Sequence, residues 1–168
     1  QRRERDRHRS DAGERDDVAV LRTVARAYGL AGRRIGYGVV PEAWGEAYAR
    51  VNTPFAANEL ACRAALAALD DEGHVEQSVE SASWAREYIA DELDAPTVDS
   101  AGNFVLAAVG DGERVAEAAQ ERGVIIRDCT SFGLPEHVRI STGTREETRE
   151  AVALLNETLA DLGLGVRA

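Results

Sequence analysis

The stretch that most constrains the fold is residues 21–38, which read LRTVARAYGLAGRRIGYG. An apolar run, Val18 to Leu21, leads into it, and a second strand-like run, Ile35 to Val40, follows. Gly29 and Gly32 mark a turn between these runs, so we expect two strands joined by a loop on a rigid base. Small residues let an anion approach the backbone, and an arginine can fork onto a phosphate. Spacing alone fits both a phosphate site and a surface turn with solvated arginines.

The residues after Thr23 also follow a known family pattern. That pattern runs Thr/Ser-x-Ser-Lys, then a short spacer, and then Leu-Ala-Gly-Leu-Arg-x-Gly-Tyr. Thr23 occupies the first hydroxyl position, and the second part is matched by Leu30, Ala31, Gly32, Arg34, Gly36 and Tyr37. On these residues the chain resembles the fold type I pyridoxal-phosphate (PLP) aminotransferases, especially the histidinol-phosphate aminotransferases.

Three positions depart from the pattern. Ala25 replaces the serine, Arg33 replaces a leucine, and Arg26 stands where the family has the lysine that binds the cofactor covalently. In the resembling enzymes that lysine forms a Schiff base with the cofactor and later moves a proton. Arginine cannot readily supply a neutral amine, because its pKa lies above about 12. The 20 cationic side chains are all arginine, so no neighbouring lysine can substitute. We therefore assign no catalytic residue and expect no covalent attachment of PLP.

Two residues of this stretch are candidate contacts for the cofactor phosphate. Arg34 lies eight residues after Arg26. In the resembling family the same spacing separates the lysine from the arginine that contacts the phosphate. The resemblance also implies that the hydroxyl of Thr23 adds a hydrogen bond to that phosphate. The alternative for Arg34 is a solvated surface arginine.

Three residues further along are candidate substrate contacts. Arg139, in the run VRISTGTREE, resembles the family arginine that holds the substrate α-carboxylate. A guanidinium suits that role, because its planar fork pairs with a carboxylate through two hydrogen bonds. Arg127 resembles the arginine that reads the phosphate end of the substrate, and a local pair with Asp128 is the alternative. Asn103 matches a segment near the family's substrate pocket.

Composition narrows the classes of partner. The chain carries 30 Asp and Glu against its arginines, for a net charge of −10. Such a surface resembles those of proteins adapted to high salt, and it disfavours nucleic-acid binding because a polyanion is repelled. We expect no membrane span and no signal peptide. No acidic or histidine cluster has metal-ligand spacing. Cys62 and Cys129 are isolated and are interpreted as reduced, buried cysteines of a cytoplasmic protein, with a disulfide or metal role as the alternative.

The fold class that follows is α/β, the C-terminal part of a fold type I PLP-transferase. Residues 1–15 mix six arginines with acids and almost nothing apolar, which predicts a disordered head. The resemblance implies that residues 16–73 end the large PLP-binding domain, that 74–93 form a long bridging helix, and that 94–168 form a small α/β domain.

Apolar periodicity predicts the elements within these parts. Helices are expected over residues 41–51, 57–69, 74–93, 113–122 and 145–162, and strands over 103–109, 124–127 and 138–141. Thr144 and Glu147 have the spacing of a capping box. The second helix is expected to bury Leu60, Ala64, Ala67 and Ala68, and the third Val75, Val79, Ala82, Ile89 and Leu93.

The resemblance implies amino transfer between histidinol phosphate and 2-oxoglutarate, in histidine biosynthesis, by a PLP-dependent homodimer. It covers the second half of such an enzyme only, so we expect this chain to be inactive alone. Alternatives are a PLP-dependent amino-acid-phosphate decarboxylase, a non-catalytic phosphate or carboxylate binder, a fragment that docks on a relative, and a decayed product without function. We also expect exposed apolar patches near Val18 to Val40 and a tendency to associate.

Overall fold

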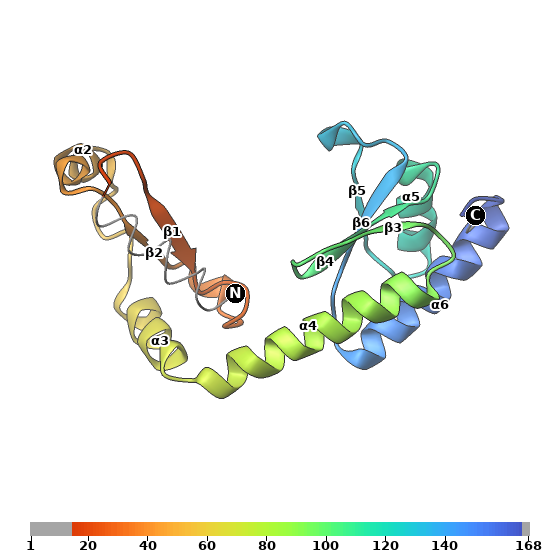
Figure 1. Ribbon diagram of the computed structural model, residues 1–168, viewed down its shortest axis with the longest axis horizontal. Coiled ribbons are helices and arrows are strands. Elements are labelled where there is room, and N and C mark those ends of the chain that lie inside the picture. The colour runs from red at the N-terminus through yellow and green to blue at the C-terminus, as the bar shows by residue number, and fades with distance from the viewer. Residues whose placement is uncertain (1–14, 166–168) are drawn as a thin grey trace. The chain divides into compact units, whose positions relative to one another are not determined.

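The computed structural model describes residues 15–165, and these divide into two compact units between Glu76 and Gln77 (Figure 1). The disordered head expected at residues 1–15 lies, except for Arg15, outside the described residues. No helix in the described range is both long and apolar enough to cross a membrane.

Unit 1 contains the strand–loop–strand expected from the glycine-punctuated stretch. Strands β1 (Val20–Thr23) and β2 (Gly36–Val39) pair antiparallel, with Val20 opposite Val39. A short 3₁₀ turn, η1 (Ala31–Arg33), lies in the loop between them. The unit continues through η2 (Glu42–Trp44), α2 (Gly45–Val51), α3 (Glu59–Leu69) and the first residues of α4 (Glu72–Glu92).

Helix α3 has a different rotational phase from the one expected. Asn58 caps it, accepting a hydrogen bond from the Ala61 amide at 2.8 Å. Ala61 is buried, and Ala65 and Ala68, four and seven residues later, are half-buried on the same side. The prediction that Leu60 and Ala67 face inward is therefore wrong, because a period of 3.6 residues turns both outward when Ala61 faces in.

Unit 2 is a four-stranded antiparallel sheet with helices, which matches the predicted α/β class. Its strand order is β3-β4-β6-β5, and α5 packs against α6 and against β6. The alternation in β6 is confirmed: Val138 and Ile140 are buried on one face, whereas Arg139 lies on the other. The elements are β3 (Thr97–Val98), β4 (Phe104–Ala108), α5 (Gly112–Glu121), β5 (Arg127–Asp128), η3 (Thr130–Phe132), β6 (His137–Ser141) and α6 (Arg145–Leu162).

The strand expected at residues 124–127 is wrong except for its last residue. After α5 the chain turns at Gly123, where φ is +88°, and the Val124 amide donates to the Ala119 carbonyl at 2.9 Å. These β-branched residues thus close the helix end instead of joining the sheet. Ile125 is 83% exposed, whereas Val124 and Ile126 pack against the core.

The hydrophobic core belongs to unit 2. The apolar stripe expected on α6 is confirmed, with Val152, Leu155 and Leu159 buried. On α4 the burial begins later than expected, because Val79 is exposed and Ala85 is the first fully buried position. The core cluster is Ile89, Leu93, Ala95, Val105, Ala107, Val109, Val115, Ala119, Val138, Ile140, Val152, Leu155 and Leu159.

Arginine–aromatic contacts connect α4 to α6. Trp84 and Tyr88 stack with their ring centroids 5.1 Å apart. The guanidinium of Arg145 lies 4.7 Å from the Trp84 centroid, and that of Arg149 lies 5.4 Å from the same ring. Contacts of this kind are worth about 0.5–1 kcal/mol at exposed sites.

The capping box of α6 is confirmed and gives a stability prediction. The Thr144 hydroxyl accepts from the Glu147 amide at 3.2 Å, and the Glu147 carboxylate accepts from the Thr144 amide at 2.8 Å. Thr144→Ala should lower the free energy of unfolding by about 1 kcal/mol, since one helix-end amide loses its acceptor. Urea unfolding measures this, with exposed Ser131→Ala as the control. Equal midpoints for both variants would contradict it.

The same capping box predicts a pH dependence. The amide of Thr144 donates to the Glu147 carboxylate, and this lowers the pKa of Glu147 below its ordinary value of 4.5. A depressed folded-state pKa means that the stabilisation is present above the unfolded-state pKa and disappears as pH falls through the folded one. The stability difference between the chain and Glu147→Gln should therefore shrink as pH is lowered from about 6 to about 3.

Candidate functional site

The two candidate phosphate contacts lie at the same end of the β1–β2 hairpin. Thr23 is the last residue of β1 and faces Gly36 across the ladder, and Arg34 precedes Gly36 by two residues. The loop between them is closed by backbone hydrogen bonds from Gly29 to Arg26 at 2.9 Å and from Leu30 to Val24 at 3.1 Å. The hairpin register therefore brings both candidate residues to one end of unit 1.

Arg34 holds an unusual backbone conformation. It is a non-glycine residue in the left-handed region, with φ 51° and ψ 46°, and its Nη1 donates to the Ala31 carbonyl at 3.2 Å. Such conformations cost about 1–3 kcal/mol and cluster at ligand sites. The side chain of Thr23 is exposed, and its oxygen accepts from the Ala25 amide at 3.1 Å. An exposed guanidinium and an exposed hydroxyl can both donate to an anion at this end of the hairpin.

Gly36 holds the two strands in register at this point. A Cβ there would lie 2.4 Å from the carbonyl oxygen of Arg22, which is backbone and cannot move aside cheaply. Gly36→Ala should force β1 and β2 apart at a cost of about 1–3 kcal/mol. Hydrogen exchange at the β1 amides should rise accordingly. Gly32→Ala is the matched control, since nothing lies within 4 Å of its added Cβ, and equal exchange in the two variants would contradict the prediction.

Arg26 occupies the position where the resemblance places the cofactor lysine. It is exposed and lies in the loop between the two strands. Its guanidinium cannot form the covalent bond that an amine forms with an aldehyde. The donors at Arg34 and Thr23 thus fit the phosphate of PLP, whereas the residue at position 26 does not fit its aldehyde.

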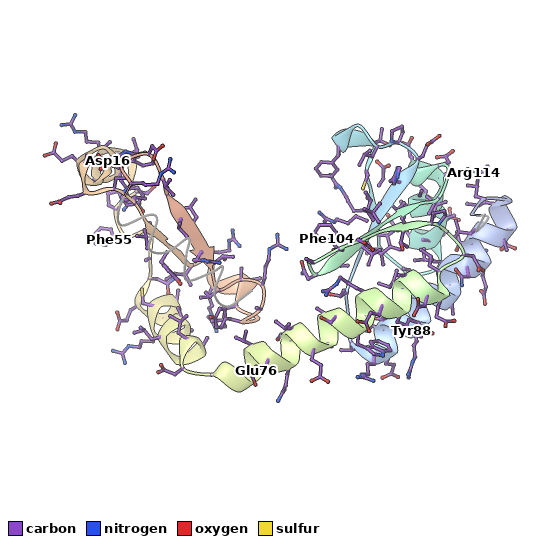
Figure 2. The ribbon with its side chains drawn as sticks, viewed as in Figure 1. Asp16, Phe55, Glu76, Tyr88, Phe104 and Arg114 are labelled. Carbon is purple, nitrogen blue, oxygen red and sulfur yellow. The ribbon has the colours of Figure 1, made fainter. Side chains whose placement is uncertain are left out.

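The candidate substrate contacts Arg127 and Arg139 lie directly opposite each other in unit 2. They are Cα partners in the β5–β6 ladder, so both side chains share one face of the sheet. The Arg139 guanidinium lies 5.4 Å from the ring centroid of Phe104, a residue that can be located in Figure 2. The Arg127 guanidinium lies 5.8 Å from the ring centroid of Phe132. Two cations opposite each other repel, which favours an anion between them.

Neither arginine has an acidic partner among the described ion pairs. The predicted alternative was a local pair of Arg127 with Asp128, and no ion pair within 4 Å joins these two described residues. The Asp128 carboxylate accepts from the Thr130 hydroxyl at 2.7 Å and from its amide at 3.0 Å, and these hydrogen bonds lower the pKa of Asp128, with a smaller contribution from the charge of Arg127. The buried Nε of Arg139 has no hydrogen-bond acceptor within the described part of the chain.

The two cysteines differ in burial. Cys129 is buried beside β5, its thiol donates to the Arg127 carbonyl at 3.6 Å, and burial raises its pKa. Cys62 is also a free thiol, but it is only half-buried on α3, so the expectation of burial is wrong for it. Its exposure follows from the helix phase that turns Ala61 inward.

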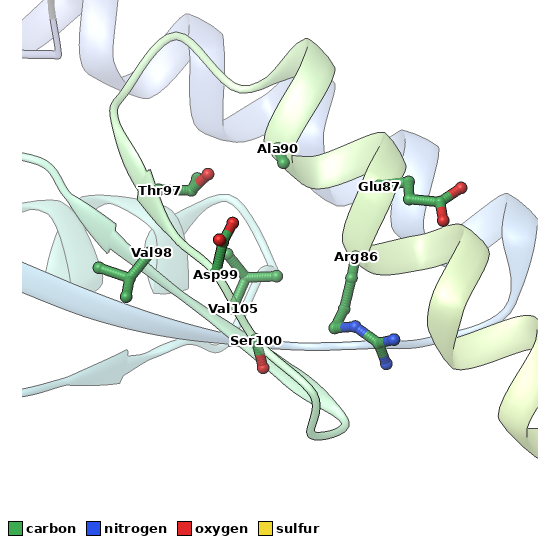
Figure 3. Close-up of a pocket in the computed structure, with 8 residues that line it drawn as sticks. All are labelled: Arg86, Glu87, Ala90, Thr97, Val98, Asp99, Ser100 and Val105. Atoms are coloured by element: carbon green, nitrogen blue, oxygen red, sulfur yellow. The ribbon is translucent and has the colours of Figure 1, made fainter. Parts of the chain in front are cut away.

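Asn103 is held beside Phe104 by contacts that sequence reasoning missed. Its carbonyl accepts from the Thr142 amide at 2.9 Å. Arg86, on α4, donates to the neighbouring Gly102 carbonyl at 2.7 Å and to the Ser83 hydroxyl at 3.0 Å. Arg86 also lines a shallow pocket of about 210 Å³ (Figure 3), together with Glu87, Ala90, Thr97, Val98, Asp99, Ser100 and Val105. The only sequence feature that could have pointed to Arg86 is its position on α4 next to the buried residues Ala85 and Ile89.

Comparison with known proteins identifies the family. The model of the family "aminotransferase class I and II" matches residues 2–155. The histidinol-phosphate aminotransferase of Halorubrum lacusprofundi is 89% identical over 155 residues, which are 92% of this chain and 43% of that relative. That of Haloarcula marismortui is 68% identical over 149 residues, covering 89% of this chain and 41% of the relative. The chain thus spans less than half the length of these relatives.

Solved structures agree with this assignment. The histidinol-phosphate aminotransferase from Sinorhizobium meliloti, solved with pyridoxal-5'-phosphate, has a TM-score of 0.78 and 29% identity, over 88% of this chain and 42% of that one. An aminotransferase structure from Burkholderia pseudomallei has a TM-score of 0.77 and 33% identity, over 84% and 45%. These neighbours confirm the predicted α/β fold of fold type I aminotransferases. The chain belongs to the aminotransferase class I and II family.

Proposed function

We propose that this chain is part of a histidinol-phosphate aminotransferase, which moves an amino group between L-histidinol phosphate and 2-oxoglutarate in histidine biosynthesis. The observation that carries the proposal is the pair of opposed arginines, Arg127 and Arg139, without an acidic partner in the described residues. The names of relatives with 68–89% identity supply the substrate. Because the chain spans less than half of those relatives and carries Arg26, we further propose that it does not catalyse the reaction alone.

Each arginine has a distinct role in this proposal. Arg139 holds the α-carboxylate of 2-oxoglutarate, since its buried Nε lacks an acceptor within the described residues and a carboxylate would provide one. Phe104 keeps its guanidinium in place through the ring contact at 5.4 Å. Arg127 binds the phosphate of histidinol phosphate. Asn103, whose carbonyl accepts from the Thr142 amide just after β6, is the third candidate contact. An anion bound beside either guanidinium would offset the repulsion between the two cations.

Arg34 and Thr23 would hold the phosphate of PLP, the cofactor with which the Sinorhizobium relative was solved. When bound, PLP supplies the electron sink for amino transfer. This chain's contribution is limited to orienting the phosphate, because Arg26 cannot attach the aldehyde. We also propose residues 16–73 as part of the large domain, 74–93 as the bridging helix, 94–168 as the small domain, and a cytoplasmic homodimer as the assembly of the whole enzyme.

A non-catalytic phosphate or carboxylate binder is the second candidate. Arg26 favours it specifically, since the substitution removes covalent chemistry and leaves Arg34, Arg127 and Arg139 in the chain. The two candidates differ in whether the complete enzyme turns over. No observation favours the related decarboxylase reaction over amino transfer.

Isothermal titration calorimetry with 2-oxoglutarate tests the carboxylate role of Arg139, because histidinol phosphate has no carboxylate. A hydrogen bond to a charged group is worth about 1.5–3 kcal/mol, so Arg139→Ala should weaken binding by roughly 10- to 150-fold. Arg114→Ala, an exposed arginine on α5 (Figure 2), makes the same change of charge and should leave affinity within about twofold. Equal loss in both variants would mean a general charge effect and would remove the proposed site.

A further inference from the structure

Arg86 lies half-buried on α4, and it belongs to none of the ion pairs among the described residues. Its Nη1 donates to the Gly102 carbonyl at 2.7 Å, and its Nη2 donates to the Ser83 hydroxyl at 3.0 Å. Hydrogen bonds from a charged donor are short and about twice as strong as those between neutral groups. In Figure 3 the Arg86 side chain leaves α4 on the side of the β3–β4 hairpin. The guanidinium therefore ties the loop at residues 99–103 to the helix.

The loop at residues 99–103 is otherwise held mainly at its end. The Gly102 amide donates to the Ser100 hydroxyl at 3.1 Å, a bond within the loop itself. The Asn103 carbonyl accepts from the Thr142 amide at 2.9 Å and from its hydroxyl at 3.1 Å, just after β6. Gly102 is exposed and has no side chain to pack, so its backbone is free to move unless it is bonded. The hydrogen bond from Arg86 supplies that restraint.

The ring of Phe104 lies beside Gly102. A Cβ added at Gly102 would lie 3.3 Å from Cε1 and 3.5 Å from Cδ1 of Phe104. The Phe104 side chain is at the surface, with 37% exposed, so Gly102 is one of the few groups against which its ring can rest. A movement of Gly102 therefore reaches the ring directly.

Phe104 in turn contacts Arg139. Leu106 is opposite Arg139 in the β4–β6 ladder, and Phe104 lies two residues before Leu106 on the same face. Diagonal neighbours of this kind are within reach of aromatic and long side chains. The guanidinium of Arg139 accordingly lies 5.4 Å from the ring centroid. Gly102 and Phe104 thus connect Arg86 on α4 to Arg139 on β6 through consecutive contacts.

We propose that Arg86 is a positioning residue, which through Gly102 and Phe104 holds the guanidinium of Arg139 in the orientation that binds a carboxylate. The inference rests on the carboxylate role proposed above for Arg139. A guanidinium that is already held in place loses less conformational freedom when the anion binds. Arg86 acts through the loop and makes no contact with the anion.

Fluorine NMR of the free chain tests the positioning without any ligand. The sequence contains three phenylalanines, so labelling with 4-fluorophenylalanine gives three signals, which Phe55→Leu and Phe132→Leu assign. Arg86→Ala should shift or broaden the Phe104 signal more than the other two. The Nε–Hε signal of Arg139, identified as the one that Arg139→Lys removes, should move in the same variant.

Three further variants separate positioning from a general loosening of α4. Arg149→Ala removes a contact between α6 and the Trp84 ring on α4 but leaves the loop bonded, so both signals should stay in place. Arg86→Lys keeps an ammonium that can donate to the Gly102 carbonyl, so both signals should return toward their native positions. Gly102→Ala pushes on the ring from the loop side and should shift the Phe104 signal with Arg86 still present.

Calorimetry with 2-oxoglutarate measures the consequence for binding. Arg86→Ala should weaken affinity roughly 2- to 10-fold, less than Arg139→Ala does, because only the prior ordering of the guanidinium is lost. Arg86→Lys should recover most of this loss, and Arg149→Ala should leave affinity unchanged.

Each outcome decides the inference. It is overturned if the Phe104 signal or the Arg139 Nε–Hε signal stays unchanged in Arg86→Ala, or if Arg149→Ala has an equal effect. It is also overturned if Arg139→Ala weakens binding and Arg86→Ala does not. If no variant alters affinity, Arg139→Ala included, the proposed function fails, and the two NMR signals alone decide whether Arg86 positions Arg139.

Discussion

Arg26→Lys is expected to give the chain a residue that PLP can modify, which it now lacks. The native sequence contains no lysine, so reduction of a PLP mixture with borohydride should leave only the terminal amine labelled. In the variant the new amine lies in the loop between Thr23 and Arg34, where phosphate contacts can hold the aldehyde close by. Peptide mass mapping should then find a pyridoxyl group on residue 26.

The control for this result is a lysine elsewhere on unit 1. Arg50, on α2, is exposed, and Arg50→Lys measures how fast PLP modifies an ordinary surface amine. At low PLP concentration we expect position 26 to react at least tenfold faster, and Arg34→Ala added to Arg26→Lys to abolish the difference. Equal rates at positions 26 and 50 would show that Thr23 and Arg34 do not hold the phosphate.

Leu155→Ala is expected to have the largest effect on stability. Leu155 is 1% exposed on α6 and belongs to the core that supports β6. Removing three buried carbons leaves a cavity, so the free energy of unfolding should fall by about 2–5 kcal/mol. Guanidinium unfolding followed by circular dichroism measures the change in the transition of unit 2.

Ile125→Ala is the comparison for that experiment. Ile125 is a β-branched residue of unit 2 that the sequence assigned to a strand and the structure leaves exposed. Its truncation should change stability by less than about 0.5 kcal/mol. A loss of stability close to that of Leu155→Ala would contradict the exposure of Ile125, because it would mean that this side chain is buried after α5.

The fold was predictable where local signals agreed. The stripe on α6, its Thr144–Glu147 capping box and the alternation in β6 all follow from spacing within a few residues, and all are confirmed. The errors arose where tertiary partners decide the outcome. Val124 to Ile126 have strand propensity, but they serve to close α5. The phase of α3 could not be read from its sequence, because alanine is common on every side of that helix.

The sequence predicted which residues belong to the candidate site better than it predicted how they are arranged in space. The pattern from Thr23 to Tyr37 identified the family and the position taken by Arg26. It could not show that Arg127 and Arg139 are paired across a ladder, because the register depends on residues far along the chain. Arg86 was missed for a similar reason, since its partner Gly102 lies sixteen residues away.

The arginine–aromatic contacts of unit 2 have a consequence for behaviour in concentrated brine. At 1 M salt the Debye screening length is roughly 3 Å, so attraction between exposed charges further apart than this is largely screened. A guanidinium packed on the face of an aromatic ring also has a dispersion contact, which salt does not screen. Brine should thus lower the affinity of Arg139 for anions without releasing it from Phe104. The recognition geometry would persist in an environment that weakens long-range attraction for the ligand.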